Sequence, residues 1–143
     1  MLKIGVDIHG VAAECTSFFA EFTKTMVAAG HEVHILSGPP LAVIRSEVEQ
    51  LGLHYTHIFS ISEFHKEAGT PMVWDANGHP FMNDYDWDKT KADYCLKHGI
   101  QLHIDDSDAY GYFFKTPYAR FYSKNKRTHY VKAQEEKKTA EEN

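Results

Sequence analysis

The sequence predicts an α/β fold, a three-layer Rossmann-like sandwich on a mostly parallel five-stranded sheet. Short apolar runs that fit strands alternate along the chain with segments whose apolar residues recur every three to four positions, as in helices. Such alternation is typical of parallel sheets joined by right-handed crossovers. The 143 residues suffice for one well-filled core but not for two ordinary domains. We therefore expect one domain over residues 1–123 and a charged C-terminal tail over residues 124–143.

An apolar run from Ile4 to Val6 predicts the first strand, which ends in Asp7 and turns through Gly10 into a helix. The apolar residues of this helix are spaced to share one buried face: Cys15, Phe18, Phe19, Phe22 and Met26. A second strand is expected over residues 31–36, with Ser37 at its tip. The next helix carries an apolar stripe formed by Leu41, Ile44, Val48 and Leu51.

Residues 55–61 predict the third strand, and Ser62 is expected to cap a short helix over residues 63–68. The pattern changes over residues 71–86, where two short apolar segments flank Asn77-Gly78, the strongest local signal for a hairpin. We expect a small β-hairpin inserted there. The aromatic residues around it suit either stacking on a base or sugar or packing of the hairpin onto the sheet, and of these we expect the packing: Trp74, Phe81, Tyr85 and Trp87.

In the last third of the chain, Asp88 is expected to cap a helix over residues 89–98. Three elements follow it: a fourth strand over residues 100–104, a short helix over 109–114 and a fifth strand over 119–122. The tail is rich in both lysine and glutamate, so we expect a frayed helix or a disordered segment there, and no nucleic-acid arm.

Composition excludes several classes of protein. The formal net charge of −5 argues against a general nucleic-acid binder, which usually carries a basic face. No run of about 18 apolar residues and no signal-peptide pattern is present, so we expect a soluble, cytoplasmic protein without a membrane anchor. Cys15 and Cys95 fall within predicted helices without ligand spacing, which favours thiols that pack in the core over a disulfide.

Polar residues follow three of the predicted strands: Asp7, Ser37 and the pair Asp105-Asp106. Parallel strands place their carboxyl ends at one edge of the sheet, so these residues should line a single crevice. Clustered carboxylates repel each other, and a hard cation such as Mg²⁺ relieves that repulsion while it binds a phosphate oxygen. Taken alone, a strand-end aspartate or a serine before Gly-Pro-Pro is more often an ordinary turn residue. The combination predicts a metal and phosphate site.

The order and spacing of these residues resemble the haloacid dehalogenase-like superfamily, which consists mostly of phosphatases and phosphotransferases. The resemblance covers roughly residues 3–123. It rests on three segments, Val6-Asp7-Ile8-His9-Gly10-Val11, Ile35-Leu36-Ser37-Gly38 and His103-Ile104-Asp105-Asp106-Ser107. It implies that Asp7 is the nucleophile, forming an aspartyl-phosphate, and also a Mg²⁺ ligand.

The resemblance also implies the remaining ligands of the site. The main-chain oxygen of His9 would be a further metal ligand, and Asp106 best matches the metal-binding acid, with Asp105 as its partner or support. Phosphoryl oxygens would be bound by Ser37, with the adjoining Gly38, and by a lysine. For this lysine the resemblance leaves two choices, Lys91 first and Lys89 second.

The sequence departs from the superfamily pattern at His9. Phosphatases of this superfamily keep a second aspartate there, which protonates the leaving group and then activates water. A histidine can transfer protons near neutral pH, but its protonated form is disfavoured beside Mg²⁺. We expect an enzyme, a Mg²⁺-dependent phosphomonoester hydrolase that acts through Asp7. The alternative is a catalytically weak or inactive protein that binds phosphate and metal.

Two further expectations concern the surroundings of the site. Only residues 8–36 separate Asp7 from Ser37, too few for a large lid, so the hairpin is the one candidate cover. Such an open site favours a large or macromolecular phosphoester, or a partner subunit that completes the lid, with a small nucleotide or sugar phosphate as the alternative substrate. The sequence contains ten histidines, so a zinc site is one candidate, with His31 and His34 as its ligands. These two residues would lie on opposite faces of a strand, and no cysteine pair accompanies them. We therefore expect no zinc site.

Overall fold

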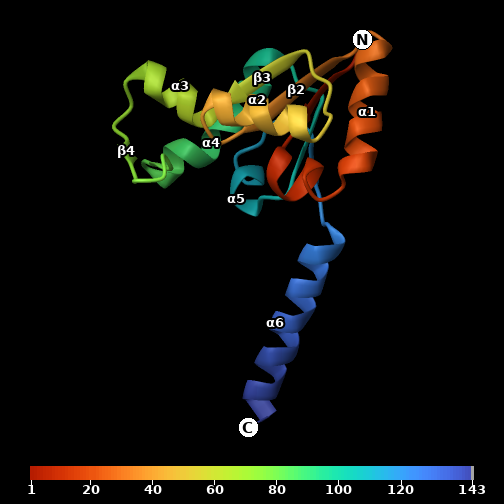
Figure 1. The fold of residues 1–143 in the computed structure, drawn as a ribbon. Helices are drawn as coiled ribbons and strands as arrows, with labels where there is room; N and C mark the ends of the chain where they lie inside the picture. Colours follow the sequence, from red (N-terminus) through yellow and green to blue (C-terminus); the bar gives the residue numbers. More distant parts are fainter. Residues whose placement is uncertain (143) are drawn as a thin grey trace.

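Five parallel strands form the central sheet, in the order β3-β2-β1-β6-β7. The structure, a computed structural model, describes the backbone over residues 1–142 and the side chains over residues 1–123 and 133–142. The sheet contains β1 (Lys3–Val6), β2 (Glu32–Ser37), β3 (His57–Ser60), β6 (Leu102–Asp105) and β7 (Tyr118–Arg120). Helices flank this sheet (Figure 1), which confirms the predicted α/β class.

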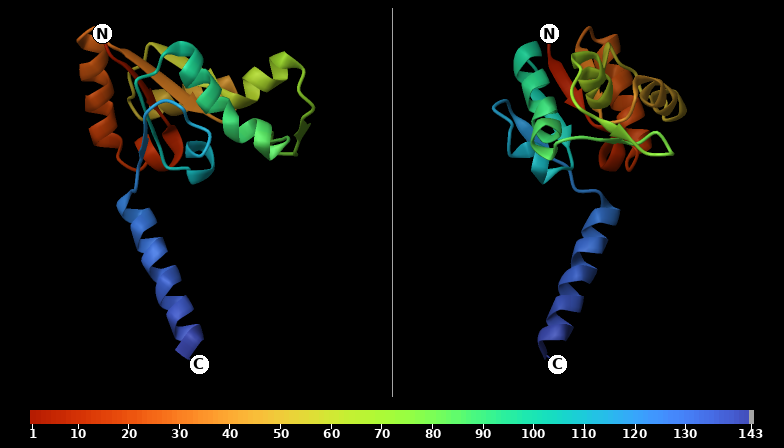
Figure 2. Two further views of the ribbon diagram at one scale, coloured as in Figure 1. Left: turned by 180° about the vertical axis from the view of Figure 1, so that it is seen from behind. Right: turned by 90° about the vertical axis from the view of Figure 1, so that its left-hand side faces the viewer.

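The helices follow the strands in the predicted alternation. They are the kinked turn η1 (Ile8–Ala12), α1 (Thr16–Ala28), α2 (Leu41–Gln50), α3 (Ile61–Ala68), α4 (Asp84–His98), α5 (Asp108–Gly111) and α6 (Lys124–Glu142). The backbone of the tail is thus helical, and α6 extends away from the α/β body (Figure 2). None of the helices in the described part of the chain has the length and apolar character that a membrane span requires.

The register of the central strands brings their carboxyl ends to one edge. Val6 pairs with Ile35 of β2 on one side and with Ile104 of β6 on the other. The amide of Asp7 continues this ladder by donating to the carbonyl oxygen of Ile104, at 3.0 Å. Residues that follow β1, β2 and β6 therefore meet at the same edge, although about a hundred positions separate them in the chain.

The core lies between the sheet and the helices on its two faces. Its fully buried members include Val6, Ile8, Val33, Ile35 and Ile44. From α1, Phe19 is buried and Phe22 packs against the same cluster, but Phe18 is exposed. Successive helical residues lie about 100° apart, so the turn that brings Phe19 inward moves Phe18 outward. Cys15 precedes α1 as its N-cap, and both Cys15 and Cys95 are free thiols.

Two helices begin earlier than the sequence predicted. Ser60, not Ser62, caps α3, because its hydroxyl accepts a hydrogen bond from the amide of Glu63. Asn83, not Asp88, caps α4, by accepting from the amide of Asp86. In both cases the capping side chain accepts a hydrogen bond from the backbone amide three residues later, which has no partner within the helix. Asp88 lies inside α4.

The predicted hairpin is present, but its packing was predicted wrongly. β4 (Val73–Trp74) and β5 (Pro80–Phe81) pair antiparallel around the Asn77-Gly78 turn. The hairpin stands beside α3 and α4, away from the central sheet (Figure 1). Three of its four aromatic residues are therefore exposed instead of packed on the sheet: Trp74, Phe81 and Tyr85. Trp87 is the exception and lies against Gly38.

Candidate functional site

Three carboxylates at the carboxyl ends of β1 and β6 come together at one edge of the sheet. An oxygen of each of Asp7, Asp105 and Asp106 lies within 4.8 Å of the others. Asp7 is only 6% exposed, Asp105 is fully buried and Asp106 is half-buried. Burial and the nearby charge of Asp105 raise the pKa of Asp7, and attraction to Lys91 only partly opposes this. Burial is thus the main reason that the protonated form of Asp7 is favoured in this cluster.

Lys91 lies between two of these carboxylates. Its Nζ donates to Asp7 Oδ1 at 2.9 Å and to Asp105 Oδ2 at 2.8 Å, and the residue is 1% exposed. Burial by itself lowers the pKa of Lys91, but attraction to the two carboxylates outweighs it and the pKa is raised, so the ammonium stays charged.

Lys89, the second choice for the phosphate lysine, lies elsewhere. Its Nζ is 3.9 Å from Asp86 Oδ1 and 5.1 Å from the centre of the Tyr85 ring, outside the lining of the pocket. Two positions along a helix correspond to a rotation of about 200°, so Lys89 and Lys91 leave α4 on nearly opposite faces. The structure thus places Lys91, and not Lys89, at the cluster.

Asp105 is the most deeply buried carboxylate of the cluster, and both of its oxygen atoms accept hydrogen bonds. Its Oδ2 accepts from Lys91 Nζ and from His103 Nε2, and its Oδ1 accepts from the amides of Asp106 and Ser107. Burial opposes ionisation of Asp105, but the hydrogen bond from His103 and the charge of Lys91 lower its pKa to about 2. Asp106 lines the pocket and Asp105 does not. Asp106 is therefore the better placed of the two to contact a bound ion.

A pocket of about 940 Å³ lies over the cluster. The hairpin turn from Asn77 to Pro80 forms part of its wall, as the sequence predicted for the candidate cover. Trp87 and Tyr110 form another part, joined by a 2.9 Å hydrogen bond from Trp87 Nε1 to the Tyr110 hydroxyl. No local sequence pattern marks this aromatic pair, because the contact joins residues of two helices, α4 and α5.

Ser37 lies at the floor of the pocket with an unused hydroxyl. The residue is buried, and its Oγ is one of three buried side-chain polar atoms without a hydrogen-bond partner among the described residues. Such an atom normally costs stability unless a ligand or water binds it. The neighbouring Gly38 approaches Trp87 so closely that a Cβ would lie 2.8 Å from the ring. The position suits a hydroxyl that binds an oxygen of a ligand.

Gly10 allows the turn after β1 to approach Asp106. Its φ is +80°, a left-handed conformation that favours glycine, and a Cβ there would overlap the carboxylate of Asp106. The close approach brings the backbone of η1 next to the side chain that lines the pocket.

We expect Gly10→Ala to destabilise the protein by about 2–4 kcal/mol, because backbone strain adds to the displacement of Asp106. Gly69→Ala is the matched control, since Gly69 has a φ of +73° and an added Cβ would meet no atom within 4 Å. The control should lose only about 1 kcal/mol. Chemical denaturation measures both, and equal losses would show that the contact with Asp106 contributes nothing.

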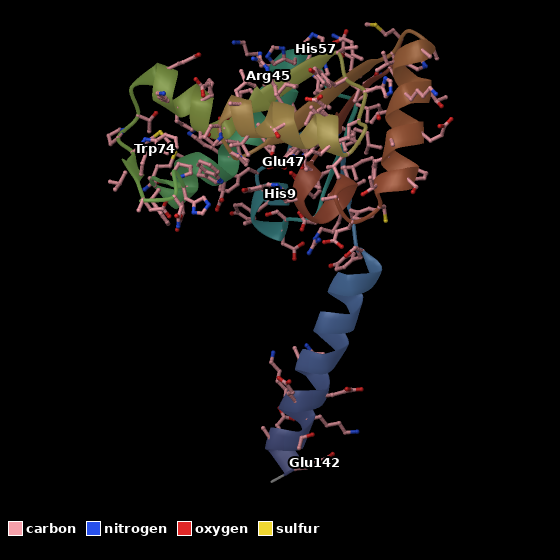
Figure 3. All side chains as sticks on the ribbon, viewed as in Figure 1. His9, Arg45, Glu47, His57, Trp74 and Glu142 are labelled. Carbon is pink, nitrogen blue, oxygen red and sulfur yellow. The ribbon has the colours of Figure 1, made fainter. Side chains whose placement is uncertain are left out.

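His9 makes a contact that the sequence did not indicate. Its Nε2 lies 2.6 Å from Glu47 Oε2 of α2, and its side chain is 58% exposed. Both side chains line the pocket, and Figure 3 shows them next to each other between η1 and α2. No sequence motif marks Glu47, because the contact depends on how α2 packs over the first turn.

The cluster suits a divalent cation bound by oxygen ligands. Its three carboxylates offer oxygen atoms that lie within 4.8 Å of one another, and Lys91 contacts two of them. Asp7, Asp106 and the main-chain oxygen of His9 would supply oxygen atoms, which Mg²⁺ prefers.

No family model matches the chain, and searches of curated proteins and of solved structures return no match.

Proposed function

We propose that this protein is a Mg²⁺-dependent phosphomonoester hydrolase of the haloacid dehalogenase-like type, with Asp7 as the nucleophile. One observation carries the proposal: Lys91 Nζ bridges Asp7 and Asp105 at the floor of a pocket that Asp106 also lines. The unpartnered hydroxyl of Ser37 adds a group that can donate to a phosphoryl oxygen.

Asp7, Asp106 and the main-chain oxygen of His9 would hold the metal. When bound, Mg²⁺ neutralises charge on the phosphoryl oxygens and orients the phosphate for attack.

The chain's own residues would perform the chemistry in two steps. A carboxylate oxygen of Asp7 attacks phosphorus, the bond to the leaving oxygen breaks, and an aspartyl-phosphate forms. Water then attacks the same phosphorus, and phosphate leaves as Asp7 is restored. Lys91 and Ser37 stabilise the negative charge on the phosphoryl oxygens throughout. His9 would give a proton to the leaving oxygen and take one from the attacking water.

The test is phosphate release by the full chain with Mg²⁺. p-Nitrophenyl phosphate, a panel of phosphorylated metabolites and a set of phosphopeptides cover small and macromolecular phosphomonoesters. We expect release from at least one of them, and its loss when EDTA removes the metal. Absence of release from all of them, with wild type and Asp7→Asn indistinguishable, would reject the proposal.

The contact between His9 and Glu47 favours a second candidate, a protein that binds metal and phosphate without turnover. The His9 side chain is 58% exposed and its Nε2 is already bonded to Glu47 of α2, so proton transfer at this nitrogen requires that contact to break. This candidate predicts phosphate binding that depends on Mg²⁺, with no release of product.

Substitution of His9 separates the two candidates. If His9 is the acid and base, His9→Ala should lower kcat by about 10²- to 10⁴-fold, the range of general acid-base catalysis. If the binder is correct, His9→Asp should create activity that the wild type lacks. His54→Ala, which changes an exposed histidine outside the pocket, should leave kcat unchanged in steady-state assays.

A further inference from the structure

A second group of metal-ligating side chains lies at the opposite edge of the sheet. Glu32 and His34 are two positions apart on β2, so they lie on the same face of the strand. His57 of β3 is the register partner of His34 and joins them on this face. On β2, Glu32 is five positions and His34 three positions before Ser37, so the group lies about 10–16 Å from the candidate active site at 3.3 Å per residue. Figure 3 shows His57 at the far end of the sheet from His9.

The ligand atoms of this group already converge. An atom from each of Glu32, His34 and His57 lies within 4.8 Å of the others. Glu32 Oε1 is 2.9 Å from His34 Nε2 and 3.8 Å from His57 Nδ1. Ligands of a tetrahedral ion with bonds of about 2.0–2.1 Å lie about 3.3 Å apart. The observed separations span that value.

His34 is held in place by a partner outside the group. The ring is 1% exposed, and its Nδ1 lies 2.7 Å from the Tyr94 hydroxyl of α4. Because a hydroxyl can accept as well as donate, the ring can carry its proton on Nδ1 and present the Nε2 lone pair to an ion. Such a hydrogen bond to the second ring nitrogen is the usual support of a histidine ligand.

His57 is the more exposed histidine of the group. Its ring stacks on that of His34, with centroids 4.1 Å apart and planes at 5°, and its Nδ1 lies 2.8 Å from the Thr56 hydroxyl. Nitrogen lone pairs lie in the ring planes, so His57 must leave this stack and its contact with Thr56, by rotation, for both rings to bind one ion. Its side chain is 47% exposed and has room to do so. The exposed side leaves a coordination position for water, and His98 lies close by, with its ring centre 6.3 Å from that of His34.

We propose that Glu32, His34 and His57 form a binding site for a first-row transition metal ion, with Zn²⁺ as the best match. Two imidazoles and one carboxylate form a ligand set typical of Zn²⁺, whereas Mg²⁺ prefers oxygen ligands alone. The odd spacing of His31 and His34 puts these two rings on opposite faces of an extended chain, whereas the even spacing of Glu32 and His34 puts them on one face of β2. The third ligand comes from the neighbouring strand, which no local sequence pattern indicates.

This site does not depend on the proposed phosphatase activity. The two edges of the sheet differ in ligand chemistry, with oxygen atoms at the carboxyl edge and mostly nitrogen atoms at the amino edge. Excess Mg²⁺ should therefore fill the acidic cluster and leave the histidine site to Zn²⁺.

The test is calorimetric titration of the full chain with Zn²⁺ in the presence of millimolar Mg²⁺. We expect one equivalent of Zn²⁺ to bind. His57→Ala and Glu32→Gln should each weaken binding at least tenfold, because each removes one of three protein ligands. Neither change touches a fully buried side chain, and thermal unfolding checks that both variants fold.

Two matched controls separate this site from others on the chain. His54→Ala removes an exposed histidine near β3, and Asp106→Asn alters the acidic cluster, so both should bind Zn²⁺ as the wild type does. Rotation of His57 on binding should also shift its ring resonances in NMR spectra, while those of His54 stay in place. Undetectable Zn²⁺ binding, or affinity that is unaffected in His57→Ala and reduced in Asp106→Asn, would overturn the proposal.

Discussion

Replacement of Lys91 by methionine should destabilise the protein by about 3–5 kcal/mol, the usual cost of removing one partner from a buried ion pair. Lys91 is 1% exposed and is the cation that contacts both Asp7 and Asp105. Methionine nearly preserves the volume of the side chain, so the loss reports charge and hydrogen bonding more than packing. Without the ammonium, two buried carboxylates face each other unneutralised. Denaturation with urea, followed by circular dichroism, measures the change.

Lys89→Met is the control for this substitution. Lys89 lies two positions away on the same helix, its side chain is 39% exposed, and its Nζ is 3.9 Å from Asp86. Surface ion pairs of this kind contribute little, so we expect a change within about 0.5 kcal/mol. Added Mg²⁺ should stabilise Lys91→Met more than wild type, because it restores positive charge to the cluster. Equal stabilities for the two variants would contradict the role of Lys91 as the neutralising cation.

Asp7→Asn should reduce phosphate release by at least about 10³-fold under the proposed function. The amide is nearly isosteric, but it cannot form the acyl-phosphate and is a poor metal ligand, and loss of a nucleophile typically costs several orders of magnitude. The fold should tolerate the change. The variant loses the attraction between Asp7 and Lys91, but it also loses the repulsion between Asp7 and Asp105, and Lys91 keeps Asp105 as its partner. We expect a stability within about 1 kcal/mol of the wild type.

Steady-state assays and unfolding of the same preparations test this pair of expectations. Asp93→Asn, an exposed substitution on α4, should keep wild-type activity and shows that one lost charge does not itself abolish turnover. Retention of more than a tenth of the wild-type rate in Asp7→Asn would exclude Asp7 as the nucleophile. If Asp7→Asn unfolds instead, the attraction to Lys91 outweighs the repulsion from Asp105.

The sequence was sufficient to predict the fold class and to predict that the polar residues meet at the carboxyl edge of the sheet. Both follow from local patterns, since alternating strand and helix periodicities imply parallel strands, and parallel strands share a carboxyl edge. The hairpin was predictable for the same reason, because Asn77-Gly78 is a local turn signal. The first residues of two helices were predicted less accurately. Their sequences offer two candidate caps each, Ser60 or Ser62 for α3 and Asn83 or Asp88 for α4, and only the backbone conformation distinguishes between them.

Only the tertiary structure decided which side chains share a face or a cavity. Lys89 and Lys91 belong to the same sequence pattern, and the face of α4 that packs on the sheet separates them. The contact of His9 with Glu47 and the grouping of Glu32, His34 and His57 depend on contacts across elements, which no local periodicity encodes. The sequence alone therefore determined the strand ends at which chemistry is expected. Packing between distant elements decided which residues can act there together.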